Sequence, residues 1–241
     1  MLTMTQIQQK LVRRAGIFGM ICLLAVSLSS CLKNNDNTVQ PPFALLSVIN
    51  ASPGSPNVDF YLDQNRASVY PIIYGSGLDY LQAYSGNRKA SFYTAGTQTL
   101  YLADTIKLQQ DKYYSLFLAN EAGHQETILV NDSISRPADG KAAIRFVNLS
   151  QNAPAADLVI KDGATLVTNK GYKGVSPFVP VDQKANYTIE VRQTGTTTVL
   201  ASLTNVPLNN GSIYTVWLQG VNGATDAKKL TAKIQKNVFY Y

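Results

Sequence analysis

Beyond residue 42, apolar and polar residues alternate along most of the chain with the period of two that is typical of β-strands. In residues 187–192, YTIEVR, the Tyr, Ile and Val side chains share one face, while Thr, Glu and Arg share the other. Residues 214–218, YTVWL, alternate in the same way and place Trp217 opposite the three other bulky side chains. Turn residues recur about every ten positions, as in residues 52–54, SPG, and 209–211, NNG. With no long helical period beyond residue 42, the pattern predicts an all-β fold.

The chain also repeats itself. Residues 47–63, SVINASPGSPNVDFYLD, resemble residues 145–161, RFVNLSQNAPAADLVIK. An offset of 98 residues pairs Asn50 with Asn148, Ser52 with Ser150, Pro56 with Pro154, Asp59 with Asp157, Tyr74 with Tyr172 and Tyr80 with Phe178. Further along, the offset becomes 100, so that residues 105–118 face residues 205–218. A slip of two residues within a loop is what duplication would leave, so we infer two copies of one module.

Each copy holds about seven short stretches of strand pattern in about 100 residues, which is typical of an immunoglobulin-like β-sandwich. We therefore expect two tandem sandwich modules, at residues 43–134 and 135–241, after a helical signal segment. One larger barrel is the alternative architecture.

Three motifs resemble a bacterial family, the domain-of-unknown-function family 4397, which is found repeated in secreted and lipid-anchored proteins. They are V-x-N-A-S-P-x-x-P-x-V-D at residues 48–59, Y-T-I-E-V with its continuation at residues 187–200, and Y-T-V-W-L at residues 214–218. Residues 137–150 are also typical of the family, and the resemblance covers roughly residues 43–220. The first copy departs from the pattern in its middle, NRKASFYTAGTQTLYLAD. The resemblance implies a sandwich fold and an envelope location, and it brings no catalytic residues.

The front of the chain has the pattern of a secretory signal. Three cations and no acid precede an apolar run of about fourteen residues, 15–28, which is shorter than the roughly twenty that a spanning helix requires. The run leads into residues 28–31, LSSC, which resemble the bacterial lipobox. That resemblance implies cleavage after residue 30 and a diacylglycerol on Cys31, with residues 31–42 as a flexible tether. The alternatives are a spanning helix, or an ordinary signal peptide with a chance cysteine.

Removal of the signal segment changes the charge and the cysteine content. The formal net charge falls from +6 for the whole chain to +3, and no dense basic stripe remains that would indicate nucleic-acid binding. Cys22 is lost with the signal and Cys31 carries the lipid, so the folded part keeps no thiol. Because Leu32 replaces the aspartate that retains some lipoproteins at the inner membrane, we expect the outer membrane, with the periplasmic or surface face left open.

Catalytic motifs are scarce in the folded part. His124 is its one histidine, and neither a G-x-S-x-G elbow, a P-loop nor a G-x-G-x-x-G is present. We therefore expect no catalytic residue, no metal and no cofactor. Asp59 and Asp157 occupy equivalent positions, where we expect each to hydrogen-bond the preceding proline-containing loop. A calcium site formed by Asp59, Asp63 and Asn65 is the alternative.

Tyrosines give the best indication of a binding surface, since nine of the fourteen lie in the first copy. Tyr74 and Tyr80 have aromatic partners in the second copy, so we assign them to packing. Four others have none and are the candidate partner-binding residues: Tyr61, Tyr70, Tyr84 and Tyr101. Exposed tyrosines bury area on a sugar or a protein at low entropic cost. The alternative is that they only cover the faces of the sheets.

Together these observations predict a non-enzymatic lipoprotein of the cell envelope, held at the membrane by the lipid on Cys31. Its tandem modules would bind a protein or glycan partner, with the first copy as the reader. Two alternatives stay open: a structural spacer in the envelope, and a glycan hydrolase that depends on two carboxylates.

Overall fold

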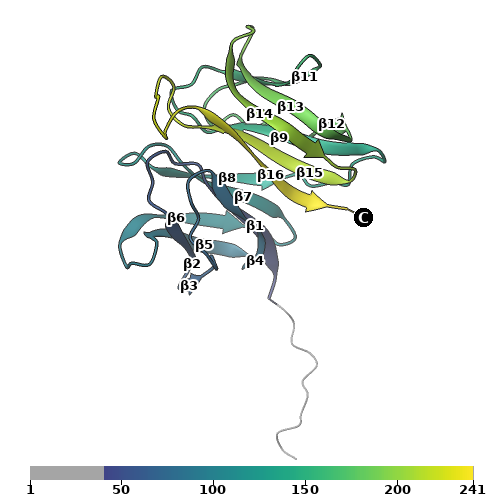
Figure 1. Ribbon diagram of the computed structural model, residues 1–241. Coiled ribbons are helices and arrows are strands. Elements are labelled where there is room, and N and C mark those ends of the chain that lie inside the picture. Colours follow the sequence, from purple (N-terminus) through teal and green to yellow (C-terminus); the bar gives the residue numbers. More distant parts are fainter. Residues whose placement is uncertain (1–40, 241) are drawn as a thin grey trace, which may run out of the picture. The chain divides into compact units, whose positions relative to one another are not determined.

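A computed structural model describes residues 41–240 (Figure 1). These residues form sixteen β-strands and no helix, which confirms the predicted all-β fold. The strands are β1 (Phe43–Asn50), β2 (Val58–Leu62), β3 (Asn65–Arg66), β4 (Ser76–Tyr84), β5 (Gly86–Thr94), β6 (Leu100–Leu108), β7 (Tyr113–Ala119), β8 (Glu126–Asp132), β9 (Lys141–Asn148), β10 (Ala156–Ile160), β11 (Thr165–Lys170), β12 (Val179–Asp182), β13 (Lys184–Gln193), β14 (Val199–Leu208), β15 (Ser212–Gln219) and β16 (Thr231–Phe239). Within residues 41–240, the structure offers no helical segment of the length and apolarity that a membrane crossing requires. The predicted signal peptide, Cys31 and most of the tether lie outside the described residues.

The strands form two sandwiches of the same topology, as the repeat predicted. In the first sandwich, a sheet of order β3-β2-β5-β6 faces a sheet of order β4-β1-β7-β8. In the second, β11-β10-β13-β14 faces β12-β9-β15-β16. The first strand of each sandwich pairs in parallel with the seventh, β1 with β7 and β9 with β15, while the remaining strand pairs are antiparallel.

Each sandwich has its own hydrophobic core, formed by the inward members of the alternating pattern. The first core contains Phe60 and Phe92, whose ring centroids are 5.2 Å apart across β2 and β5. The second contains Leu158 and Val191, which face each other at the same place in the register of β10 and β13. Burial of such side chains contributes about 1.5–3 kcal/mol each, so two cores of this size account for much of the stability.

A third apolar cluster joins the two sandwiches. It is formed by the outward side chains of β1, β7, β9 and β15, together with residues that flank them: Ile49, Ala51, Phe117, Ala119, Val147, Leu149 and Trp217. Trp217 lies on the opposite face of β15 from the second core, as its place in the alternation predicted. The two middle sheets are therefore covered on both faces, and the four sheets stack as layers (Figure 1).

A buried ion pair lies in this junction. Arg145 on β9 is 1% exposed and its Nη1 lies 2.5 Å from Asp132 Oδ1 on β8. The guanidinium also donates to Ser115 and Thr215, and the ring of Phe178 stacks on it at 4.7 Å. Every polar group in this network has a partner, which is the condition for tolerating a buried charge.

The junction brings equivalent residues together in a reciprocal way. Tyr172 of the second sandwich donates to Glu126 on β8, and Tyr74 of the first lies beside Thr231 on β16, the strand equivalent to β8. Burial raises the pKa of Tyr74 to about 12, with Thr231 and Gln219 offsetting part of the shift. Burial also raises the pKa of Tyr172, and Glu126 adds to the shift. The aromatic pairs that the repeat assigned to packing thus pack between the sandwiches.

Candidate functional site

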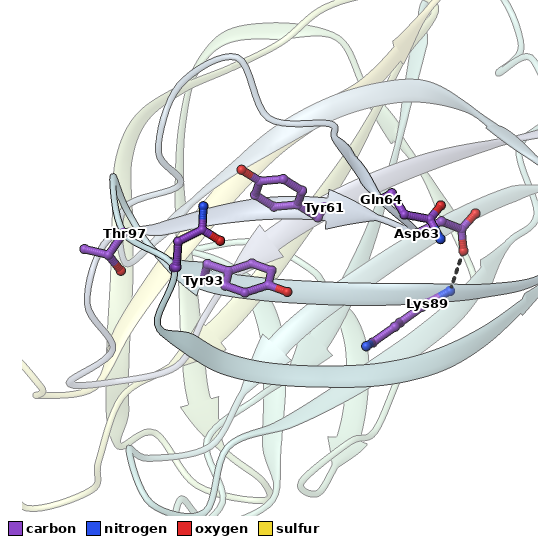
Figure 2. Close-up of a pocket in the computed structure, with 7 residues that line it drawn as sticks. Tyr61, Asp63, Gln64, Lys89, Tyr93 and Thr97 are labelled. Atoms are coloured by element: carbon purple, nitrogen blue, oxygen red, sulfur yellow. Dashed lines mark hydrogen bonds between the residues drawn. The ribbon is translucent and has the colours of Figure 1, made fainter.

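A shallow trough lies on the outer face of the first sandwich, on β2 and β5 of the sheet β3-β2-β5-β6 (Figure 2). Its volume is about 360 Å³, and its lining is Tyr61, Asp63, Gln64, Lys89, Tyr93, Thr97 and Gln98. The turn after β2 bounds one end of the trough, and the turn between β5 and β6 bounds the other (Figure 2). A site of this size suits a small ligand or a short segment of a polymer.

Two tyrosine rings form the middle of the trough. Strand alternation sends Phe60 and Phe92 into the core, so their neighbours Tyr61 and Tyr93 point outward. The two rings meet edge to face, with centroids 5.1 Å apart and planes at 72°. This geometry is favourable for aromatic pairs, and it holds both rings in place before a ligand binds.

The polar groups at the Asp63 end are arranged by local hydrogen bonds. Asp63 has a positive φ of 55° in the tight turn after β2, and its Oδ1 accepts from the backbone N–H of Lys89 at 2.9 Å. Its Oδ2 accepts from Arg88 at 3.2 Å. The carboxylate is therefore compensated, while the ammonium of Lys89 forms no ion pair with any residue between 41 and 240.

A buried hydroxyl lies in the same part of the sheet. Ser91 faces Tyr61 across β2 and β5 and points outward between Lys89 and Tyr93. It is only 1% exposed, and its Oγ has no hydrogen-bond partner among the described residues. The hydroxyl is therefore not among the groups that line the trough.

Of the four candidate tyrosines, only Tyr61 lines the trough. Tyr70 lies in the loop between β3 and β4 and is 77% exposed. Tyr84 ends β4, is 57% exposed and lies under the guanidinium of Arg88. Tyr101 packs against the first core, and its hydroxyl lies 3.5 Å from buried Ser52. The reason for the position of Tyr101 is an irregularity in the β5–β6 register beside Tyr93, which takes Tyr101 out of simple alternation.

Tyr93 is the aromatic residue of the trough that the sequence pattern did not predict. It lies in the middle of the first copy, where the family motifs are weakest. One signal was available, because KASFY at residues 89–93 alternates and places Tyr93 on the same face as Lys89. Pairing of β5 with β2 then brings Tyr93 beside Tyr61, which only the strand order reveals.

A second groove adjoins the first. It lies where the two sheets of the first sandwich open at the edge of β4, has a volume of about 300 Å³, and is lined by Leu62, Asp63, Asn65, Ala67, Leu81, Gln82, Ala83, Tyr84 and Arg88. Asp63 lines both hollows, so the trough and the groove meet at the turn after β2. Tyr84 thus belongs to an extension of the site and not to the tyrosine pair.

The predicted hydrogen bonds of Asp59 and Asp157 to the proline-containing loops are wrong. Asp59 accepts from Arg66 at 2.6 Å and from the backbone N–H of Gly96 at 2.9 Å, and Asp157 accepts from Asn169 and Thr194. The cause is strand direction, since both carboxylates point along the outer face toward the β5–β6 and β13–β14 turns. The carboxylates of the proposed calcium site, Asp59 and Asp63, are each engaged by an arginine.

The other candidate chemistry is dispersed. His124 is exposed in the turn after β7, and within the described part of the chain only its backbone N–H is hydrogen-bonded. Between residues 41 and 240, no three His, Cys, Asp or Glu side chains come close enough to hold a metal ion. The trough itself offers a ligand aromatic rings for stacking, polar groups for hydrogen bonds and the ammonium of Lys89.

Several solved structures are distantly similar to this chain. A carbohydrate-binding module of family 26 from Eubacterium rectale Amy13K, solved in complex with maltoheptaose, is 12% identical and covers 80% of this chain and 97% of its own, with a TM-score of 0.29. Family 41 carbohydrate-binding modules from streptococcal virulence factors are 13% identical and cover 79% of this chain and 96% of their own, with a TM-score of 0.25. The Bacillus anthracis TIE protein is 12% identical over 81% of this chain and 44% of its own, also with a TM-score of 0.25. No curated protein matches the chain.

One family model matches the sequence. The matched stretch, residues 44–159, begins in β1, spans the first sandwich and continues through β9 into β10. It carries the first of the motifs on which the resemblance rested, together with the junction at residues 137–150. The family is described as Domain of unknown function (DUF4397), and the match supports membership of this chain in it.

Proposed function

We propose that the protein is a non-enzymatic glycan-binding lipoprotein of the cell envelope, and that the trough of the first sandwich is its binding site. The observation that carries the proposal is the pair of outward tyrosines, Tyr61 and Tyr93, held edge to face 5.1 Å apart among side chains with free hydrogen-bonding groups. Sugar rings present apolar faces and hydroxyl edges, so an aromatic platform with amide and ammonium groups around it fits them.

The size of the site favours a glycan over a protein partner. A stable protein interface buries about 800 Å² on each side and involves roughly 20–30 residues. The trough has seven lining residues, and the groove next to it adds eight others. A short stretch of a sugar chain fills such a hollow without requiring more surface.

Binding to a glycan array, followed by titration calorimetry on the best ligand, tests the proposal. Tyr61→Ala and Tyr93→Ala should each weaken binding by at least about tenfold, the loss expected of a contact that carries roughly 1.4 kcal/mol or more. Tyr70→Ala is the matched control, because Tyr70 is exposed in the same sandwich but does not line the trough. Equal weakening by all three variants, or none, would exclude the tyrosine pair as the binding site.

The membrane anchor is a separate part of the proposal, supported by the lipobox-like residues 28–31. Two or three acyl chains hold a protein firmly, because each buried methylene contributes roughly 0.8 kcal/mol. Labelled fatty acid should be incorporated by the wild-type chain and not by Cys31→Ala. Protease treatment of intact cells would then distinguish a surface location from a periplasmic one.

We also propose that the second sandwich is a second copy of the same family, on the strength of the shared strand order and the repeat.

A structural spacer is the second candidate function. The four-layer packing favours it, because the covered junction joins the two sandwiches through a continuous apolar cluster and a buried ion pair. A spacer predicts that loss of both tyrosines leaves every phenotype of the cell unchanged. Loss of glycan-dependent attachment in the Tyr61→Ala, Tyr93→Ala strain would argue against it.

A further inference from the structure

The outer face of the β3-β2-β5-β6 sheet has an unbalanced positive charge. Its acid Asp59 is paired with Arg66 at 2.6 Å. Lys89 on β5 and Lys107 on β6 also point to this face, since Lys89 faces Thr105 and Lys107 faces Asn87 in the strand register. Neither lysine forms an ion pair or hydrogen bond through its side chain with any residue that the structure describes.

The acid that lines the trough beside Lys89, Asp63, is already paired. Asp63 accepts from the backbone N–H of Lys89 with one oxygen and from Arg88 with the other. Its charge is therefore compensated by Arg88, and the ammonium of Lys89 is left as the free charge of the trough. A ligand that carries an anion would meet that ammonium without displacing an existing ion pair.

We propose that the ligand of the trough is an acidic glycan, whose sugar ring stacks on Tyr61 and Tyr93 while a carboxylate on the ring meets Lys89. This inference rests on the proposed function and specifies its ligand class. Lys107, diagonal to Lys89 on the neighbouring strand, is placed to meet an acidic group on the next sugar. A polyuronate, which carries one carboxylate on every sugar, matches this arrangement.

The second sandwich lacks this arrangement. The register of β10 with β13 places Arg192 where Tyr93 lies and Thr188 where Lys89 lies, with Val159 in place of Tyr61. Arg192 is paired with Glu190 at 2.5 Å and so offers no free charge. Free cation and tyrosine pair occur together in the first sandwich, as a single acidic ligand would require.

The charge contributes a modest preference. An ion pair at an exposed site changes affinity by roughly two- to fivefold, and salt screens it, since the Debye length is about 8 Å at 0.15 M ionic strength. Stacking should supply the greater part of the affinity and should persist at high salt. The expected signature is thus a preference for the acidic ligand that disappears when either the salt is raised or the lysine is neutralised.

The test compares matched ligands on the full-length protein purified in detergent. The probes are oligogalacturonate, alginate and hyaluronate oligosaccharides, each beside the same oligosaccharide with its carboxylates reduced to primary alcohols. The acidic member of a pair should bind roughly two- to fivefold more tightly at low salt. Lys89→Gln should remove that difference between the two members of a pair, whereas Lys112→Gln, in the turn before β7, should leave the difference as it is in wild type.

The outcomes separate this inference from the proposed function. If the reduced members bind as well as the acidic ones, the acidic ligand class is overturned and glycan binding survives. If neither member of any pair binds, both proposals fall. A preference that persists in Lys89→Gln would overturn the assignment of the charge to Lys89.

Discussion

The two sandwiches share their topology and differ most on their outer sheets. On the outer face of the first, Tyr61 and Tyr93 form an aromatic pair, and Ser91 lies opposite Tyr61 on β5. At the same register in the second, Val159 replaces the first tyrosine, and an ion pair of Glu190 with Arg192 replaces the rest. The first sandwich thus has an open aromatic trough, whereas the second has an ion pair between its own residues at the equivalent position.

The inner sheets differ from the outer sheets, because their equivalent residues have the same role in both sandwiches. They meet through equivalent strands, and each sandwich contributes the same positions, such as Phe117 from β7 and Trp217 from β15. Tyr74 meets β16 while its counterpart Tyr172 meets β8, the reciprocity of an isologous interface. Equivalent sheet faces thus keep the same role where they pack on each other, and their residues differ where they face solvent.

The largest effect that we expect is on the junction. Arg145→Ala removes the partner of Asp132, which has no exposed surface in its side chain, and leaves an uncompensated buried carboxylate. Such a loss costs about 3–5 kcal/mol. Urea unfolding followed by the fluorescence of Trp217, the only tryptophan and a residue of the junction, should show the midpoint fall accordingly.

A double variant controls for this experiment. Arg145→Met with Asp132→Leu removes both charges together and keeps apolar volume in the junction, so it should recover most of the lost stability. If Arg145→Ala were as stable as wild type, the packing of the two sandwiches would not depend on this ion pair. The buried junction would then contribute less to stability than its burial indicates.

Much of the fold could be predicted because it follows from local pattern. Alternation at residues 187–192 and 214–218 located β13 and β15, and it placed Trp217 on the face away from the second core. The repeat located the two sandwiches. Parallel pairing of β1 with β7 could not be predicted, because strand partners far apart in sequence leave no trace in alternation.

The site was harder to predict for the same reason. Tyr61 was selected since the second copy has no aromatic residue at its position, but the partner that gives it a site, Tyr93, comes from another strand. The proximity of the two tyrosines depends on the register of β2 with β5, which places Asp59 opposite Tyr93 and Tyr61 opposite Ser91, and alternation within one strand does not give that register. The junction was missed altogether, since the pattern of a strand does not tell which sheet covers its second face.

The second prediction concerns the response of the junction to alkaline pH. Burial raises the pKa of Tyr74 from 10.0 to about 12, so its neutral form is favoured in the folded state. The stability linked to that proton is fully present below pH 10, and it is lost as the pH rises through about 12. Between these limits, wild type should lose about 2 kcal/mol more than Tyr74→Phe, with one unit of pKa equal to about 1.36 kcal/mol.

Unfolding midpoints of the two proteins at several pH values between 9 and 12 would measure this difference, in which lysine titration is common to both. Parallel curves for wild type and Tyr74→Phe would show that the junction does not shield the Tyr74 hydroxyl from water, and that burial does not raise its pKa.

A transplant of the tyrosine pair sharpens the comparison of the outer sheets. The triple change Val159→Tyr, Glu190→Ser and Arg192→Tyr gives the second sandwich the tyrosine pair and the serine of the first, and leaves Thr188 in place of Lys89. We expect a second glycan site that binds an acidic ligand roughly two- to fivefold more weakly than the first, because Thr188 stands where Lys89 lies. Titration calorimetry should then report two sites per chain, and a folded variant with a single site would show that the tyrosine pair is insufficient.

The smallest effect concerns the ion pair that replaces the trough. Arg192 and Glu190 retain 24% and 10% of their side-chain exposure, so water still reaches the pair. Arg192→Ala should therefore lower the free energy of unfolding by no more than about 1 kcal/mol, and 1 M salt should reduce the difference, because screening acts on exposed charges and far less on buried ones. The loss caused by Arg145→Ala should be unchanged by the same salt. If both losses responded alike, the two arginines would occupy similar environments. The contrast between an outer sheet face exposed to solvent and an inner sheet face packed on the other sandwich would then be wrong.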